Sequence, residues 1–391
     1  NAFALKSNSV ILGADANVGI GTSSPTHKLT VVGKTMLFDT LILNYGTPNP
    51  GDVLIASDNT GKVAWGEQAQ NNWSTGGNGG TSPGTDFIGT TDNQSLIFKI
   101  NNQHFGQLNH NVHSISFGSR IPTNAGQSVF IGDSTGYATF GGGNTFVGYK
   151  AGRKTDNGNF NSFYGFESGL NTVNASFNSF YGHQSGMKNI SGQYNTFFGS
   201  SAGSKNQNGN SNTFLGSSSG SSNVDGNNNV GVGSSLTASH IGNQNTAVGN
   251  QALEGVSQSH SNTAIGFNAG ARITDDSIAV NNTFLGINTR AQNILGDSIV
   301  NVTVIGANAF ALKSNSVILG DNANVGIGTS SPTHKLTVVG NTMLSDTLSL
   351  NYSAPNAGDI LVAADNSGKA IWVDPGQYTN TSEQDPQVSS T

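Results

Sequence analysis

The sequence predicts an all-β chain whose central part is a parallel β-solenoid. A five-residue phrase recurs between Gly118 and Gly320: Asn, then Thr or Ser, two mostly apolar residues, and Gly. Glycine makes up 53 of the 391 residues, with abundant Asn and Ser, which suits many tight turns. No segment has a sustained period of 3.6 residues. A phrase that recurs at a nearly fixed interval, here mostly 17 residues, is typical of solenoids.

The phrase sets the length of each turn. Its glycines recur every 17 residues from Gly148 to Gly233, and then at 16, 17, 20, 20 and 14 residues. Such a turn holds two short strands and two bends, and stacked turns form a continuous parallel sheet. We expect about twelve turns between Gly118 and Gly320. The repeated positions are Asn144, Asn161, Asn178, Asn195, Asn212, Asn229, Asn245, Asn262 and Asn282, with Gly148, Gly165, Gly182, Gly199, Gly216, Gly233, Gly249, Gly266 and Gly286.

Each position of the phrase has an expected role. Gly takes a bend that residues with a Cβ resist, and Asn stacks on the Asn of the next turn as an amide ladder. Successive strand side chains point to opposite faces, yet Phe146 and Val147 are both apolar. One apolar row fills the roll, and the other would lie exposed unless partner chains cover it. We therefore expect an intertwined homotrimer, the rival being a larger single-chain β-helix. The expected trimer and core stack is Phe146, Phe163, Phe180, Phe197, Phe214 and Phe284.

Modules flank the solenoid. Residues 1–65 and 308–372 align without a gap, with 51 of 65 positions identical, which predicts a tandem array with a period near 307 residues. An accidental duplication is the alternative. We expect the first copy to begin at the end of a truncated upstream roll. The predicted divisions are a β connector module at 1–66, a Gly-rich β connector at 67–117, the β-roll at 118–320, a second connector module at 321–373, and a linker or disordered tail at 374–391.

Short strands are predicted within these modules. Val18–Ile20 and Leu29–Val32 alternate around a Thr-Ser-Ser-Pro turn. Two equivalent hairpins are expected, each crossing a short polar loop that contains Gly. They are Asp52–Ser57 with Lys62–Trp65, and Asp359–Ala364 with Lys369–Trp372. Further strands are expected at Phe87–Thr90 and Ser95–Asn101.

Composition excludes several classes of function. A net charge of −6 gives no footprint for nucleic acid, and no apolar run is long enough to span a membrane. The absence of Cys excludes disulfides and thiolate metal sites. The Gly-rich strings lack the Lys-Ser/Thr of a phosphate loop. No paired carboxylates or Ser-His-Asp arrangement can be singled out, so we expect neither an enzyme nor a cofactor. A glycan lyase would require a carboxylate cluster.

Three histidines form the one candidate metal site. His104, His110 and His113 lie close in sequence, and on a threefold axis one His per chain would supply three ligands. Exposed or packed histidines are the simpler interpretation.

Two surfaces are candidates for recognition. Thr or Ser occupies the second place of most phrases, and a flat Thr row would suit ice or a crystalline polysaccharide. Apolar neighbours on the strands argue against that use. Longer loops at Ala271–Asn281 and Ala291–Asn301 are the favoured binding elements, because loops on a rigid scaffold usually carry binding residues.

The repeated Asn-Thr/Ser-x-x-Gly phrase resembles the left-handed parallel β-roll head repeats of trimeric autotransporter adhesins, the YadA-like head. The flanking NVGIGTSSPTHKLTVVG and GDVLIASDNTGKVAW segments are similar to modules of Bacteroidetes surface and tail-fibre-like proteins. The 17-residue turns are longer than the usual head repeat, and no coiled-coil stalk or membrane anchor is visible.

The resemblance implies a secreted, homotrimeric fibre that binds surfaces. We expect a structural and adhesive segment of a long extracellular fibre at the cell surface. Its expected partners are other copies of the chain and surface glycans or receptors. The alternative is a receptor-binding tail fibre of a phage or contractile injection system.

Overall fold

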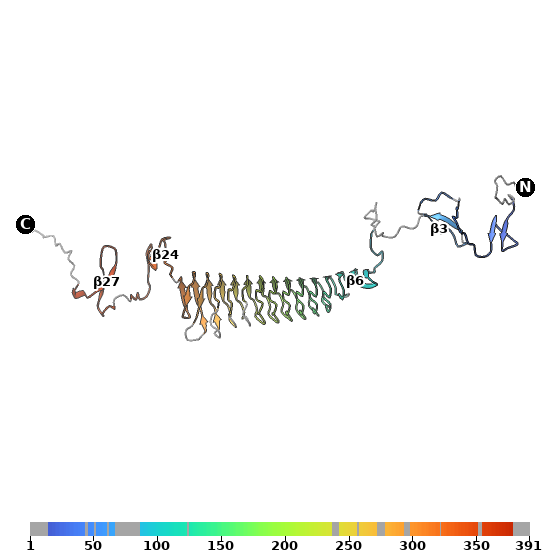
Figure 1. Cartoon of the computed structure of the whole chain (residues 1–391). Helices are drawn as coiled ribbons and strands as arrows, with labels where there is room; N and C mark the ends of the chain where they lie inside the picture. The colour runs from blue at the N-terminus through green and yellow to red at the C-terminus, as the bar shows by residue number, and fades with distance from the viewer. Residues whose placement is uncertain are drawn as a thin grey trace, which may run out of the picture. The chain divides into compact units, whose positions relative to one another are not determined.

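The protein is all-β, and its centre is a β-solenoid of about eleven turns (Figure 1). The computed structural model describes residues 15–377, with gaps at 44–45, 51, 61, 67–86, 123–124, 237–241, 256–257, 272–277, 293–297, 321 and 351–353. Contacts divide the chain into two compact units, Asn1–Gly89 and Thr90–Thr391. In the described part the single helix is the 3₁₀ turn η1 (Pro375–Gln377).

The first unit contains two small sheets. Strands β1 (Val18–Ile20) and β2 (Leu29–Val31) pair in parallel, and β3 (Val53–Ala56) and β4 (Val63–Gly66) form an antiparallel hairpin. The four strands and the hairpin were predicted from the sequence and are confirmed, whereas the parallel pairing of β1 with β2 was not predicted.

The second copy of the duplicated sequence folds in the same way. Strands β24 (Val325–Ile327) and β25 (Leu336–Val338) pair in parallel, and β26 (Ile360–Ala363) and β27 (Ala370–Val373) form a hairpin. The expected tail lies outside the described residues from 378 onward.

One 15-stranded sheet forms the long side of the solenoid (Figure 1). From β7 (Ser114–Phe117) to β23 (Ser316–Leu319) its neighbouring strands are parallel. The three middle residues of the phrase form nearly all of these strands, as the repeat predicts. They are β8 (Val129–Ile131), β9 (Thr145–Val147), β10 (Ser162–Tyr164), β11 (Ser179–Tyr181), β12 (Thr196–Phe198), β13 (Thr213–Leu215), β14 (Val230–Val232), β15 (Thr246–Val248), β16 (Thr263–Ile265), β18 (Thr283–Leu285) and β21 (Val302–Ile305).

An antiparallel pair begins this sheet. Strands β5 (Leu96–Ile100) and β6 (Gln103–Asn109) pair with each other, and β6 pairs with β7, so the sheet continues into the segment before Gly118. The strand expected at Phe87–Thr90 is wrong, because this segment is bent. The Thr90 hydroxyl donates to the carbonyl of Gln94 (2.9 Å), which curls the chain instead of extending it.

The two 20-residue turns and the 14-residue turn that follows them carry additional short strands. Strand β17 (Ala279–Val280) pairs with β20 (Ile299–Val300), and β19 (Arg290–Ala291) pairs with β22 (Phe310–Ala311). The parts of the longer loops at 272–277 and 293–297, where binding was expected, lie outside the described residues.

The predicted asparagine ladder runs through the interior. Nδ2 and the backbone N–H of Asn161 both donate to Oδ1 of Asn144, at 3.2 and 2.9 Å. Nδ2 also donates to the carbonyl of Ala175 (2.9 Å), so the buried amide is satisfied on every side. The same pattern links the turns as far as Asn282, whose Oδ1 accepts the N–H of Val302. The exception is Asn195, whose N–H donates to Oδ1 of Asn178 while its Nδ2 donates to Oδ1 of Asn189 (3.3 Å). Burial without these bonds would be costly.

The glycine that closes each phrase is required by both conformation and space. Eight of the nine predicted glycines have φ between +130° and +140°, and Gly233 has +92°. A Cβ on Gly165 would lie 2.5 Å from the carbonyl oxygen of Gly182 in the next turn. Both observations confirm that this corner excludes other residues.

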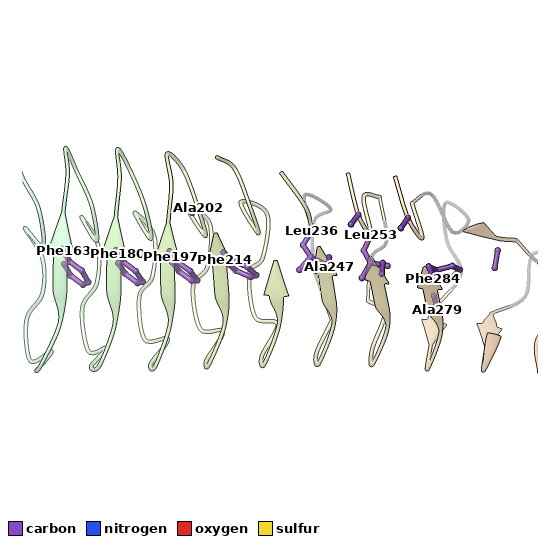
Figure 2. Packing of buried hydrophobic residues seen from close by; sticks show 14 of the residues in the cluster. Phe163, Phe180, Phe197, Ala202, Phe214, Leu236, Ala247, Leu253, Ala279 and Phe284 are labelled. Carbon is purple, nitrogen blue, oxygen red and sulfur yellow. The ribbon is translucent and has the colours of Figure 1, made fainter. Parts of the chain in front are cut away.

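Phenylalanine rings fill the interior of a single chain. Phe146, Phe163, Phe180 and Phe197 have no exposed surface, and neighbouring ring centroids are 4.7 to 4.8 Å apart with planes within 5°. Phe214 and Phe284 are equally buried (Figure 2). All six rings are therefore core residues within one chain, and an interface between chains would have to use the other apolar row.

The core changes composition where the ring stack ends. Gly231, Ala247 and Ala264 replace Phe in the three turns between Phe214 and Phe284, and Leu236 and Leu253 fill the interior of the first two (Figure 2). These leucines have positive φ of 52°, where the aromatic turns have Gly. The unfavourable backbone costs about 1–2 kcal/mol, and burying Leu recovers about 2–3 kcal/mol. In the aromatic turns Leu cannot replace this Gly while the Phe is present, since a Cβ on Gly186 would lie 2.3 Å from Phe180. We call the paired change of Phe to a small residue and Gly to Leu the exchange.

A second buried amide ladder was not predicted. Nδ2 of Asn206 donates to Oδ1 of Asn189 (2.5 Å), and Nδ2 of Asn223 donates to Oδ1 of Asn206 (2.6 Å). Thr155 and Thr172 hold this place in earlier turns, and their buried hydroxyls form no hydrogen bond. The 17-residue spacing from Thr155 to Asn223 is present in the sequence. Each of these residues follows another polar residue, such as Lys188 before Asn189, so the sequence does not show which of the two points inward.

Replacing Asn195 by Leu tests the first ladder. The change removes the acceptor of the Asn212 N–H and Nδ2 and the donor to the Gly209 carbonyl. We expect a loss of about 3 kcal/mol or more in a urea titration followed by circular dichroism. The control is Asn208→Leu on the exposed surface, with an expected change within about 0.5 kcal/mol. Equal losses would contradict the ladder account.

A double substitution tests the exchange of Phe for Leu. Phe180→Ala should cost about 3–5 kcal/mol, and Gly186→Leu alone should also destabilise because of its clash. Phe180→Ala combined with Gly186→Leu reproduces the Ala247–Leu253 arrangement. We expect the double variant to lose clearly less stability than the sum of the single variants. Additive losses would refute the exchange.

Candidate functional site

The outer face of the long sheet carries a continuous apolar row. The residue after each core Phe, or its equivalent, points outward and pairs in register with the same residue of the next turn, as in Tyr164 with Tyr181. We call this set the outer apolar row: Ile131, Val147, Tyr164, Tyr181, Phe198, Leu215, Val232, Val248, Ile265, Leu285, Ile305 and Leu319.

Most of the outer apolar row is open to solvent in one chain. Phe198 is 58% exposed, and Ile131, Ile265, Leu285 and Leu319 are each 43–45% exposed. The expectation that one apolar row fills the roll and the other lies outside is confirmed in this chain.

Other outer positions do not stay apolar along the roll. Tyr149 and Phe166 are followed at the same place by polar residues from His183 to Asn250, before Phe267 and Ile287. Phe160, Phe177 and Tyr194 are followed by Ser211 and Asn228. The outer apolar row keeps its character through those same turns, with Phe198 and Leu215. Its constancy therefore does not follow from a general apolar composition.

Hydroxyl side chains run beside the outer apolar row. Thr145, Ser162, Ser179, Thr196 and Thr213 are half-buried or exposed at the start of their strands. Neither row contains a charged residue from β8 to β23. The outer sheet face is thus an uncharged surface with one apolar row and one row of hydroxyl side chains, which Val129, Val230 and Val317 interrupt.

Exposed aromatic side chains stack along two further lines. Phe160, Phe177 and Tyr194 have centroid separations of 5.3 and 5.1 Å, with planes within 18°. Tyr149, Phe166 and His183 stack in the same manner. Rings stacked on each other present edges to solvent, so their faces are mostly unavailable to a sugar or a base.

The three histidines considered for metal binding lie at the start of the roll. His104 belongs to β6, and its buried Nε2 forms no hydrogen bond. The rings of His110 and His113 are 5.7 Å apart. Across the described residues, no group of three or more His, Asp or Glu side chains is arranged to hold a metal within one chain.

Two aspartates are held in the hairpin loops. The Thr60 hydroxyl and then its N–H lower the pKa of Asp58, and Ser367 does the same for Asp365. Because the pKa is lower in the folded chain than in the unfolded chain, the ionised carboxyl stabilises the fold at pH values above the ordinary carboxyl pKa. This stabilisation is lost as the pH falls through the lowered pKa. Both carboxyls are exposed, and these bonds shape the two loops.

Comparison with known proteins gives no match to a family model, a curated protein or a solved structure. In the part of the chain that is described, no helix is both long and apolar enough to cross a membrane.

Proposed function

We propose that this chain is a structural and adhesive segment of a long extracellular fibre. In this proposal three copies associate through their outer apolar rows, the rolls are left-handed, and the small sheets connect successive rolls. The duplicated module at an offset of 307 residues supports a tandem array of such units.

The constancy of the outer apolar row is the observation that carries the proposal. Monomeric soluble proteins rarely expose a contiguous apolar patch of this extent. The row stays apolar in every turn from Ile131 to Leu319, while the neighbouring rows carry Ser or Asn in several turns. A small ligand would need only part of it. A second copy of the same roll, in register, matches its full length.

The available area supports the same conclusion. Twelve side chains, mostly about two-fifths exposed, offer on the order of 700 Å² of apolar surface per chain. A stable protein interface buries about 800 Å² per partner. The adjacent hydroxyl row would bring the buried area into that range without burying a charge. Chains arranged with cyclic symmetry around one axis would close such a row on itself, and three is the number proposed here.

Substituting an outward residue tests the assembly. Phe198→Asp together with Leu215→Asp should place buried charges at every chain contact and give a folded monomer of 40.2 kDa. The unsubstituted chain should sediment at three times that mass. Ser200→Asp together with Ser217→Asp, at outward places beside the sheet, is the matched control and should stay trimeric.

Circular dichroism separates loss of assembly from loss of folding, because the core rings are internal to each chain. An unsubstituted chain that sediments as a monomer would refute the proposal.

A further inference from the structure

Basic residues gather in the first turns of the roll. Between Asn144 and Asn206 the chain has five basic residues and two acidic ones, Asp156 and Glu167, while the whole chain has a net charge of −6. This part of the roll is therefore positively charged on an otherwise acidic protein.

Three of these basic residues form a straight line. Lys154, Lys188 and Lys205 occupy the same place in their turns, each six residues after the closing Gly, and Asn171 holds that place in the remaining turn. We call these three residues the lysine row. Backbone bonds stack the row, with Lys154 N–H donating to Leu170 O (3.1 Å) and Lys188 N–H to Ser204 O (3.1 Å). Successive places are thus about 4.8 Å apart along the roll.

The ammonium groups of the lysine row are available to a ligand. All three residues are exposed, and among the described residues none of them forms an ion pair. Lys150 differs, since it pairs with Glu167 (3.8 Å) and lies over the Tyr149 ring. Asp156 is near Lys154 in sequence but does not pair with it. Lys188 and Lys205 occupy neighbouring places about 4.8 Å apart, and Lys154 lies two places from Lys188, so these like charges repel each other unless an anion lies between them.

A row of hydrogen-bonding side chains runs parallel to the lysine row. Three residues further along each turn come Asn157, Asn174, Ser191 and Asn208, all exposed. Bonds between turns orient them, as in Ser191 Oγ donating to Asn208 Oδ1 (2.8 Å). These amides and hydroxyls match the hydroxyl groups of sugars.

We propose that the lysine row and its amide row bind a linear acidic polysaccharide lying along the roll. Its carboxylates would contact the lysines, and its hydroxyls would contact the amides. This inference rests on the adhesive role proposed above and gives its ligand class. A nucleic acid fits less well, because the exposed aromatic rings are stacked on each other and leave few faces for bases.

Binding to polygalacturonate tests the proposal, with dextran as the neutral polymer. We expect the full chain to bind polygalacturonate and not dextran. Raising the salt from about 0.01 M to about 0.15 M should weaken binding, since the Debye length falls from about 30 to about 8 Å. Lys154→Gln, Lys188→Gln and Lys205→Gln combined should weaken it by about tenfold or more.

The control variant carries Lys313→Gln, Lys335→Gln and Lys369→Gln, which removes the same charge from exposed places outside the lysine row. It should bind within about twofold of the original chain. Asn171→Lys, which completes the row, should tighten binding by about threefold or more, whereas Ser200→Lys in the same part of the roll should not.

Equal losses in the two triple variants would overturn the inference, because net charge alone would then explain binding. Tighter binding to a thymidine oligonucleotide or to phosphatidylglycerol vesicles than to polygalacturonate would also overturn it. Sedimentation of the same samples separates the two proposals. A trimer that binds no polygalacturonate refutes the ligand and leaves the assembly intact, while a monomer refutes the assembly.

Discussion

Hydrogen bonds between buried asparagines of successive turns determine the rest of this structure. From Asn144 to Asn282 each Oδ1 accepts the backbone N–H of the next turn, and most also accept the Nδ2 of the next Asn, so a slipped turn would bury unsatisfied polar groups. The turns from Asn229 to Asn245 and from Asn262 to Asn282 differ by four residues in length, yet their ladder bonds are 2.9 to 3.1 Å. Extra residues are therefore directed into loops, and the register is kept.

That fixed register converts sequence repeats into straight surface rows. The outer apolar row, the hydroxyl row beside it and the lysine row each run along the roll because equivalent residues stand one above another. A line of equivalent groups suits a partner that is itself linear, either another roll or an extended polymer. The proposed assembly and the proposed ligand use different rows, so they do not compete for the same residues.

The sequence predicts the parts of the fold that depend on one residue type at one place. The amide ladder from Asn144 and the corners at Gly148 and its equivalents were predictable, because Asn and Gly there have few alternative uses. Which of Phe146 and Val147 points inward was not predictable, since both are apolar. Only the packing of Phe146 against Gly152 shows that the Phe side chain lies inside. Leu236 and Leu253 fill the space that a Phe ring occupies in other turns. That role depends on the absence of Phe several residues away, which no local sequence pattern reveals. The segment Phe87–Thr90 is bent although its residues favour a strand. The hydrogen bond from the Thr90 hydroxyl to the Gln94 carbonyl accompanies this bend and could not be read from the sequence.

Burial of the outer apolar row between copies is the central claim, and an electron cryomicroscopy reconstruction of the full chain tests it most directly. The account predicts a particle with threefold symmetry in which Tyr181, Phe198 and Leu215 of each roll face the axis and contact the other two rolls. Single rolls, or an assembly that leaves these three side chains in solvent, would contradict it.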